Sequence, residues 1–148
     1  ARAEGLDAVR FLGQQPKGRV PPLLGISDVA LVHLKREPLF GTVLPSKIFE
    51  AAAMGRPILL GVEGHAAKLV GDNEMGLCFE PENAEQLVAG LDRLRSDPAL
   101  RERLGRNGQQ MVTKSFNRDS LARQFLALLE GVVRRGHRTQ LQPGSASR

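Results

Sequence analysis

The sequence predicts an α/β domain built on a doubly wound, Rossmann-like parallel sheet. Short apolar runs, rich in Leu or β-branched residues, alternate with helical patterns in the part of the chain before Phe79. This alternation is the rhythm of βαβ units, whose strands are parallel and whose helices cover the faces of the sheet. After Phe79, three helical patterns follow with no further strand pattern. We expect that helical end to pack across the sheet domain.

Four apolar runs are the predicted strands, and they cover residues 9–13, 28–34, 57–61 and 76–79. The first run ends in Gly13 and has no element before it to pair with or to cover it. We therefore expect the chain to be a fragment of a longer domain. Apolar sheet surface would then stay open and favour self-association.

Six segments show helical patterns, at about residues 20–25, 46–54, 64 or 65–70, 84–95, 98–114 and 118–134. Asn83 is placed to cap the fourth helix, and Pro98 ends it. In the sixth segment, apolar residues repeat at the spacing of one helical face, at Leu121, Phe125, Leu128, Leu129 and Val132.

The helix predicted after the second strand carries its own start and stop signals. Ser46 is a good N-cap, and Pro45 disfavours a helix that continues from upstream. Gly55 supplies a left-handed residue at the C-terminus. Because this helix follows a parallel strand, its free backbone N–H groups lie where open α/β folds bind phosphates. Lys47 adds a positive charge at that point.

Glu50 lies one turn into this helix, on the same side as Ser46, because four residues separate them. A carboxylate can accept hydrogen bonds from two vicinal hydroxyls at once, which suits a ribose. A solvated helix with an ordinary surface Glu and Lys remains the alternative. Glu63 and His65 follow the third predicted strand and are second-rank candidates for contact with a ligand.

Composition excludes several classes of protein. No apolar run among the 148 residues approaches the length of a membrane-spanning helix. The formal net charge of +5 lies mostly in residues 134–148, and Trp and Tyr are absent, so we expect no nucleic-acid partner. Cys78 is the only cysteine, and we expect a buried, inert thiol. No metal-ligand spacing occurs, and we expect neither a metal ion nor another cofactor.

Short motifs are spread along the chain in a regular order. They are Phe11-Leu12-Gly13 with Pro16, Val20-Pro21 through Ser27-Asp28-Val29, Pro45-Ser46-Lys47-Ile48-Phe49-Glu50-Ala51 with Gly55-Arg56-Pro57-Ile58, Gly76-Leu77 with Glu80-Pro81-Glu82-Asn83, Asp97-Pro98, Leu104-Gly105 and Asn107-Gly108. In this order and spacing the chain resembles the C-terminal half of a family-4 retaining glycosyltransferase of the GT-B fold. Its Pro-Ser-Lys variant is similar to bacterial N-acetyl-L-fucosamine transferases of O-antigen and capsule synthesis.

The resemblance implies a binding site for a UDP-sugar donor. The family's motif of Glu, seven residues and Glu ends at Glu50, and this Glu binds the ribose. The first Glu of the motif is Thr42 here, so the carboxylate near the donor sugar is missing. Gly13 and Gln14 match the loop beside the nucleotide base. The residues that face the sugar and the diphosphate are Thr42, Leu44, Pro45, Ser46 and Lys47.

The resemblance also implies parts that this chain lacks. A basic Arg and Lys pair, which neutralises the leaving diphosphate, and an N-terminal acceptor domain would precede residue 1. The catalytic residues are therefore unknown, and we expect the chain alone to be inactive. Residues 1–133 correspond to a partial donor-binding domain. Residues 134–148 form a basic tail, which we expect to be disordered and which is a candidate for contact with an anionic membrane surface.

The expected function is transfer of a hexose from a UDP-sugar to a lipid-linked or polysaccharide acceptor in bacterial surface-glycan synthesis. No signal-peptide pattern opens the chain, so we expect a cytoplasmic protein, peripheral at most to the inner face of the membrane. Two alternatives stay open: a nucleotide-sugar epimerase of the same fold, and a non-catalytic nucleotide-binding or interaction module.

Overall fold

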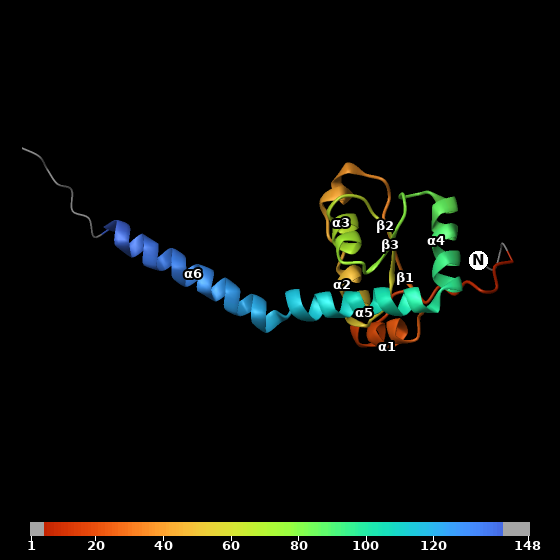
Figure 1. Ribbon diagram of the computed structural model, residues 1–148, viewed down its shortest axis with the longest axis horizontal. Helices are drawn as coiled ribbons and strands as arrows, with labels where there is room; N and C mark the ends of the chain where they lie inside the picture. The colour runs from red at the N-terminus through yellow and green to blue at the C-terminus, as the bar shows by residue number, and fades with distance from the viewer. Residues whose placement is uncertain (1–4, 141–148) are drawn as a thin grey trace, which may run out of the picture.

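The computed structural model describes residues 5–140, and its three strands form one parallel sheet in the order β1–β2–β3 (Figure 1). The strands are β1 (Ala30–His33), β2 (Ile58–Gly61) and β3 (Gly76–Cys78). In the register, Ile58 lies opposite both Ala30 and Gly76. Three of the four predicted strands are confirmed, each shorter than the apolar run that predicted it.

The predicted strand at residues 9–13 is wrong. These residues adopt no regular structure, and Phe11 is 84% exposed. An apolar pattern is local, whereas a strand exists only when a neighbour completes its hydrogen bonds. The one backbone hydrogen bond recorded here joins the Val9 N–H to the Leu6 carbonyl at 3.2 Å, within a turn.

All six predicted helices are present. They are α1 (Val20–Gly25), α2 (Ser46–Ala53), α3 (His65–Asp72), α4 (Ala84–Ser96), α5 (Pro98–Ser115) and α6 (Arg118–Gln140), with short 3₁₀ segments η2 (Lys17–Arg19) and η3 (Pro38–Thr42). Asn83 caps α4 as predicted, because its side-chain oxygen accepts the Gln86 N–H at 3.0 Å. Helix α6 continues into the segment for which the sequence predicts a tail. Residues 141–148 of that segment lie outside the described residues.

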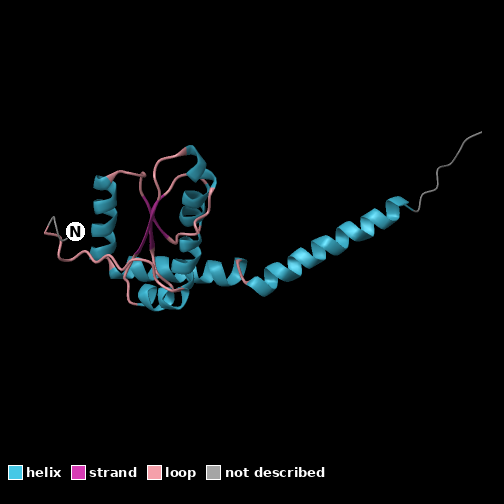
Figure 2. Ribbon diagram, turned by 180° about the vertical axis from the view of Figure 1, so that it is seen from behind, coloured by secondary structure: helices cyan, strands magenta, loops and turns pink. Residues whose placement is uncertain are grey.

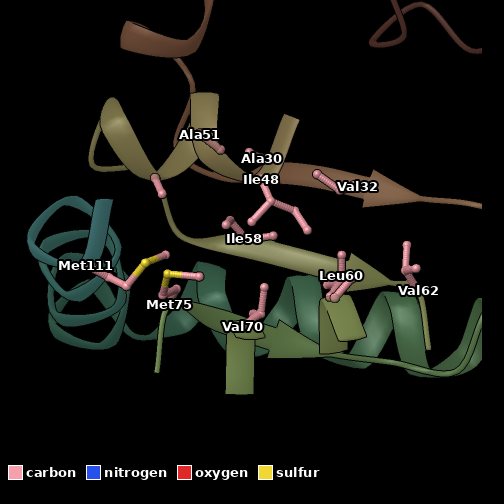
Figure 3. Close-up of a cluster of buried hydrophobic side chains, with 12 residues drawn as sticks. Ala30, Val32, Ile48, Ala51, Ile58, Leu60, Val62, Val70, Met75 and Met111 are labelled. Carbon is pink, nitrogen blue, oxygen red and sulfur yellow. The ribbon is translucent and has the colours of Figure 1, made fainter. Parts of the chain in front are cut away.

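Helices cover both faces of the parallel three-stranded sheet, which confirms the α/β class (Figures 1 and 2). Successive side chains of a strand point to opposite faces. Ile58 and Leu60 join the core against α2 and α3 (Figure 3). Leu59, between them, joins a second core with Leu94 of α4 and Leu104 of α5. Ile58, Leu59 and Leu60 are fully buried, as expected for the central strand of a two-faced sheet.

The helical end packs across the domain only in part. Helix α5 does so, with Leu104 and Met111 buried, but α6 extends away from the body (Figure 1). A new helix starts at α6 because the Asn117 side chain accepts the N–H groups of Asp119 and Ser120. Its predicted apolar face is formed but stays open, with Phe125 63% exposed. Among residues 5–140, no helix combines the length and the hydropathy of a membrane-spanning segment.

Candidate functional site

Helix α2 is held from two sides. Ile48 and Ala51 are buried against the sheet core. On the other side α5 approaches very closely. A Cβ atom on Gly105 would overlap the carbonyl oxygen of Gly55, and one on Gly108 would lie 3.3 Å from the Cβ of Ala52. These glycines let the two helices meet almost backbone to backbone, so the position of α2 is tightly fixed.

The start of α2 corrects the predicted N-cap. Pro45, not Ser46, occupies the cap position, with extended angles of φ −60° and ψ 130°, and no side chain caps the helix. Ser46 is already helical, so its hydroxyl does not take the capping role. The Ile48 N–H donates to the Pro45 carbonyl at 3.1 Å. The N–H groups of Ser46 and Lys47 have no recorded partner among residues 5–140, and they form the positive end of the helix.

Glu50 borders a pocket of about 420 Å³ between the η2–α1 segment and α2. Its lining residues are Lys17, Val20, Pro21, Leu24, Glu50, Ala53 and Met54. A volume of this size lies within the range of small-molecule sites. The Glu50 side chain is exposed, and no hydrogen bond or ion pair engages its carboxylate within the described residues. An apolar wall with one free carboxylate is therefore open to a ligand.

The other predicted donor-site residues lie outside this pocket. Gly13, with a positive φ of 64°, and Gln14 belong to an exposed loop ahead of η2. Thr42 closes η3, because its hydroxyl donates to the Leu39 carbonyl at 2.8 Å. Leu44 is 44% exposed in the short link to α2. The structure therefore places Thr42 to Ser46 between the end of β1 and the start of α2, at the carboxyl edge of the sheet.

The η3 segment rests on the start of α3. Gly64 has a positive φ of 70°, and a Cβ atom there would overlap the carbonyl oxygen of Gly41. Glycine is needed at this position both for the backbone angle and for the close approach. His65 opens α3 as predicted and is exposed. This contact keeps residues 38–46, which include η3 and the start of α2, beside the carboxyl ends of β1 and β2.

A polar cluster that the sequence analysis missed ties together the segments after the three strands. Nη2 of Arg36 lies 3.2 Å from Oε1 of Glu63 and 3.4 Å from Oε1 of Glu80. The Arg36 N–H donates to Oε2 of Glu82 at 3.1 Å, and the Glu82 N–H donates to Nε2 of His33 at 3.1 Å. The sequence feature that could have indicated this cluster is a charged residue soon after each strand. Glu63 is thus engaged by Arg36, although the pair is half exposed and contributes little to stability.

Cys78 is exposed, so its predicted burial is wrong. It ends β3, which has a neighbour on one side only and therefore lies at the edge of the sheet. Its sulfur atom lies 3.7 Å from the carbonyl oxygen of Ala67. Partial desolvation of the sulfur raises the pKa of the thiol above its ordinary value of 9.0. The thiol is consequently a weak nucleophile at neutral pH.

We expect alkylation of Cys78 to be slower in the folded chain than in the urea-unfolded chain at every pH between 7 and 9. The thiolate is the reacting form. The alkylation rate of the folded chain should therefore rise about tenfold per pH unit while the pH stays below the thiol pKa. Because the raised pKa favours the neutral thiol, the midpoint of the rate profile should lie higher in the folded chain. Iodoacetamide labelling followed by mass spectrometry measures both profiles. An alkylation rate of the folded chain that stops rising below pH 8 would contradict the raised pKa of Cys78.

Comparisons with known proteins agree with one another. Residues 1–111 match the family model described as glycosyl transferases group 1. The chain is 33% identical over 114 residues to the MMP alpha-(1->4)-mannosyltransferase of Mycolicibacterium hassiacum, covering 76% of this chain and 26% of that protein. It is 30% identical over 131 residues to the lipopolysaccharide core biosynthesis glycosyltransferase LpsD of Rhizobium meliloti, covering 87% and 36%.

A solved structure shows the same arrangement. The sucrose-phosphate synthase of Thermosynechococcus elongatus superposes with a TM-score of 0.74 at 29% identity, over 89% of this chain and 34% of that one. The chain thus spans between about a quarter and a third of the length of the relatives it matches.

Proposed function

This chain belongs to the glycosyl transferase group 1 family, and we propose that it is the donor-binding half of a retaining hexosyltransferase that uses a UDP-sugar. The observation that carries the proposal is the carboxylate of Glu50, which has no partner among residues 5–140 and lies on the rim of an apolar pocket, one turn from the exposed start of α2. An apolar wall with a few placed polar groups is the usual character of a small-molecule site. In this proposal the base lies in the pocket and the ribose hydroxyls donate to Glu50.

The diphosphate is proposed to lie at the start of α2. The free N–H groups of Ser46 and Lys47, the positive end of the helix and the Lys47 ammonium group would then stabilise negative charge. This charge matters most when the bond between the sugar and the β-phosphate breaks, because the phosphate oxygen keeps the electron pair. The acceptor oxygen forms the new bond to the anomeric carbon, and its proton passes to the leaving phosphate oxygen. Arg36, which is tied to Glu63 and Glu80, would brace the neighbouring loops.

The acceptor is proposed to be a lipid-linked or polysaccharide glycan of the bacterial surface, held by an N-terminal domain. One observation supports this part. The chain spans about a third of the lipopolysaccharide core glycosyltransferase that it resembles, which leaves room for a further domain in a protein of that length.

Replacement of Glu50 tests the proposal directly. We expect Glu50→Ala to weaken UDP binding about tenfold or more, because hydrogen bonds to a charged acceptor contribute about 1.5–3 kcal/mol each. Calorimetric titration at fixed salt without divalent metal measures the dissociation constant. The matched control is Glu85→Ala, which removes an exposed carboxylate from the first turn of α4. Its UDP affinity should equal that of the parent.

A second ligand isolates the ribose contact. The parent chain should bind 2′-deoxy-UDP more weakly than UDP, and this difference should shrink in Glu50→Ala because the partner of the 2′-hydroxyl is gone. Equal UDP affinity in the parent and in Glu50→Ala, with both chains folded by circular dichroism, would overturn the assignment of Glu50.

A further inference from the structure

A second pocket lies at the amino edge of the sheet, opposite the edge that carries the start of α2. Asp28 and Arg56 border it, and they precede β1 and β2 by two residues each. Another wall is a face of α5 that carries Arg101, Glu102 and Arg106. The volume of about 280 Å³ suits a molecule smaller than a nucleotide. Three arginines against two acidic residues give the lining an excess of positive charge.

The guanidinium group of Arg56 is anchored by one nitrogen and unpaired along one edge. Its Nη1 donates to the carbonyl oxygen of Ser27 at 3.1 Å. Its Nε is buried without a hydrogen-bond partner among residues 5–140, and none is recorded there for Nη2. Nε and Nη2 form a two-donor edge of the kind that binds phosphate or carboxylate oxygens. Because Nε is shielded from water, solvent does not supply the missing acceptor.

The other charged residues of the lining differ in how far they are balanced. Nη1 of Arg106 lies 2.5 Å from Oε1 of Glu102, so these two charges compensate each other. Arg101 is half-buried, and its Nη1 donates to a backbone carbonyl at the end of α4 at 3.0 Å. Asp28 is exposed, and no ion pair is recorded for it within the described residues. The balance that a ligand meets is therefore Arg56 and Arg101 against Asp28 alone.

We propose that this pocket binds a small soluble phosphate monoester, with Arg56 as the principal contact. A phosphate group carries several acceptor oxygens, so it can meet the Nε and Nη2 edge of Arg56 and still accept from Arg101. Its negative charge matches the excess positive charge of the lining. The site shares no residue with the pocket at Glu50 or with the start of α2, so it does not depend on the proposed function.

Titration of the isotope-labelled 148-residue chain with glycerol 3-phosphate, followed by nuclear magnetic resonance, locates the site. The Arg56 Nε–H signal should move downfield as it gains an acceptor, together with backbone signals of residues 55–57 and 101–106. Glycerol, which lacks the phosphate, should move none of these signals. Shifts confined to residues 46–50 would place the phosphate at the start of α2 and overturn the inference. Binding to phosphatidic acid vesicles without binding of glycerol 3-phosphate would overturn a soluble ligand.

Two substitutions with opposite expected effects separate this site from general charge attraction. Arg56→Met should weaken glycerol 3-phosphate about tenfold, the size of one charge-assisted hydrogen bond. The matched control is Arg93→Met, which removes the same charge from an exposed position of α4 outside the lining and should keep the parent affinity.

Asp28→Asn should tighten binding about twofold, because it removes a like charge from the pocket. Asp28 is exposed, so this variant tests the site even if Arg56→Met does not fold. Equal losses in Arg56→Met and Arg93→Met would overturn the inference, and so would weaker binding in Asp28→Asn. Either result would leave the UDP affinities of the parent and Glu50→Ala, and with them the proposed function, untouched.

Discussion

Substitution of Gly105 by Ala should lower the free energy of unfolding by about 3 kcal/mol. The added Cβ atom would overlap the carbonyl oxygen of Gly55, which is backbone and cannot rotate away. Gly55 itself has a positive φ of 64°, so its peptide is constrained by the end of α2. Relief of the clash requires α5 and α2 to separate, and this would expose Ala52 and Met111 of the core. UDP affinity should fall as well, because α2 carries Glu50.

The same change at Gly71 provides the control. Gly71 also lies in a helix, α3, but a Cβ atom there meets nothing within 4 Å. Gly71→Ala should therefore raise stability by about 0.5–1 kcal/mol through helix propensity. The chain has no Trp or Tyr, so urea unfolding is best followed by circular dichroism. Equal unfolding midpoints for the two variants would show that α5 and α2 do not meet through Gly105.

The elements that the sequence predicted correctly are those with local causes. The cap at Asn83 and the left-handed Gly55 are both realised, since each depends on a few neighbouring residues. The cap at Ser46 is a local failure, since the helix begins one residue earlier than predicted and Pro45 takes the cap position. The other two failures depend on distant parts of the chain. Residues 9–13 have a strand pattern but no paired strand, and Cys78 is exposed because β3 is an edge strand. Neither pairing nor edge position can be read from a short apolar run.

The same distinction between local and distant causes applies to the residues of the candidate site. The position of Glu50, one turn into α2, was predictable because it follows from helical spacing alone. The position of Lys17 at the pocket was not, because it depends on how η2 and α1 lie beside α2. The methyl group of Met54 lies 3.7 Å from the position that a Cβ atom on Gly25 would take. That contact joins two segments about 30 residues apart, which a reading by periodicity does not bring together.

Leu59→Ala should cost about 3–4 kcal/mol of stability. Leu59 is fully buried on the α4 face of β2, in a core with Leu94 and Leu104. Truncation removes apolar contacts and leaves a cavity that the surrounding helices cannot fill. The exposed Val88 of α4 is the matched control, and Val88→Ala should change stability by less than about 0.5 kcal/mol. A small loss in Leu59→Ala would mean that α4 collapses onto the sheet.

Packing in the second core leads to a sharper prediction, because Leu59 lies against Gly90. A Cβ atom on Gly90 would lie 2.8 Å from Cδ1 of Leu59, and full burial prevents that side chain from moving away. Gly90→Ala should therefore cost about 1 kcal/mol in the parent, as overpacking exceeds the gain in helix propensity. In the Leu59→Ala background the space is free, and the same change should stabilise by about 0.5–1 kcal/mol. The double-mutant cycle should thus give a coupling of about 1.5–2 kcal/mol. Strict additivity would contradict the packing of α4 on β2.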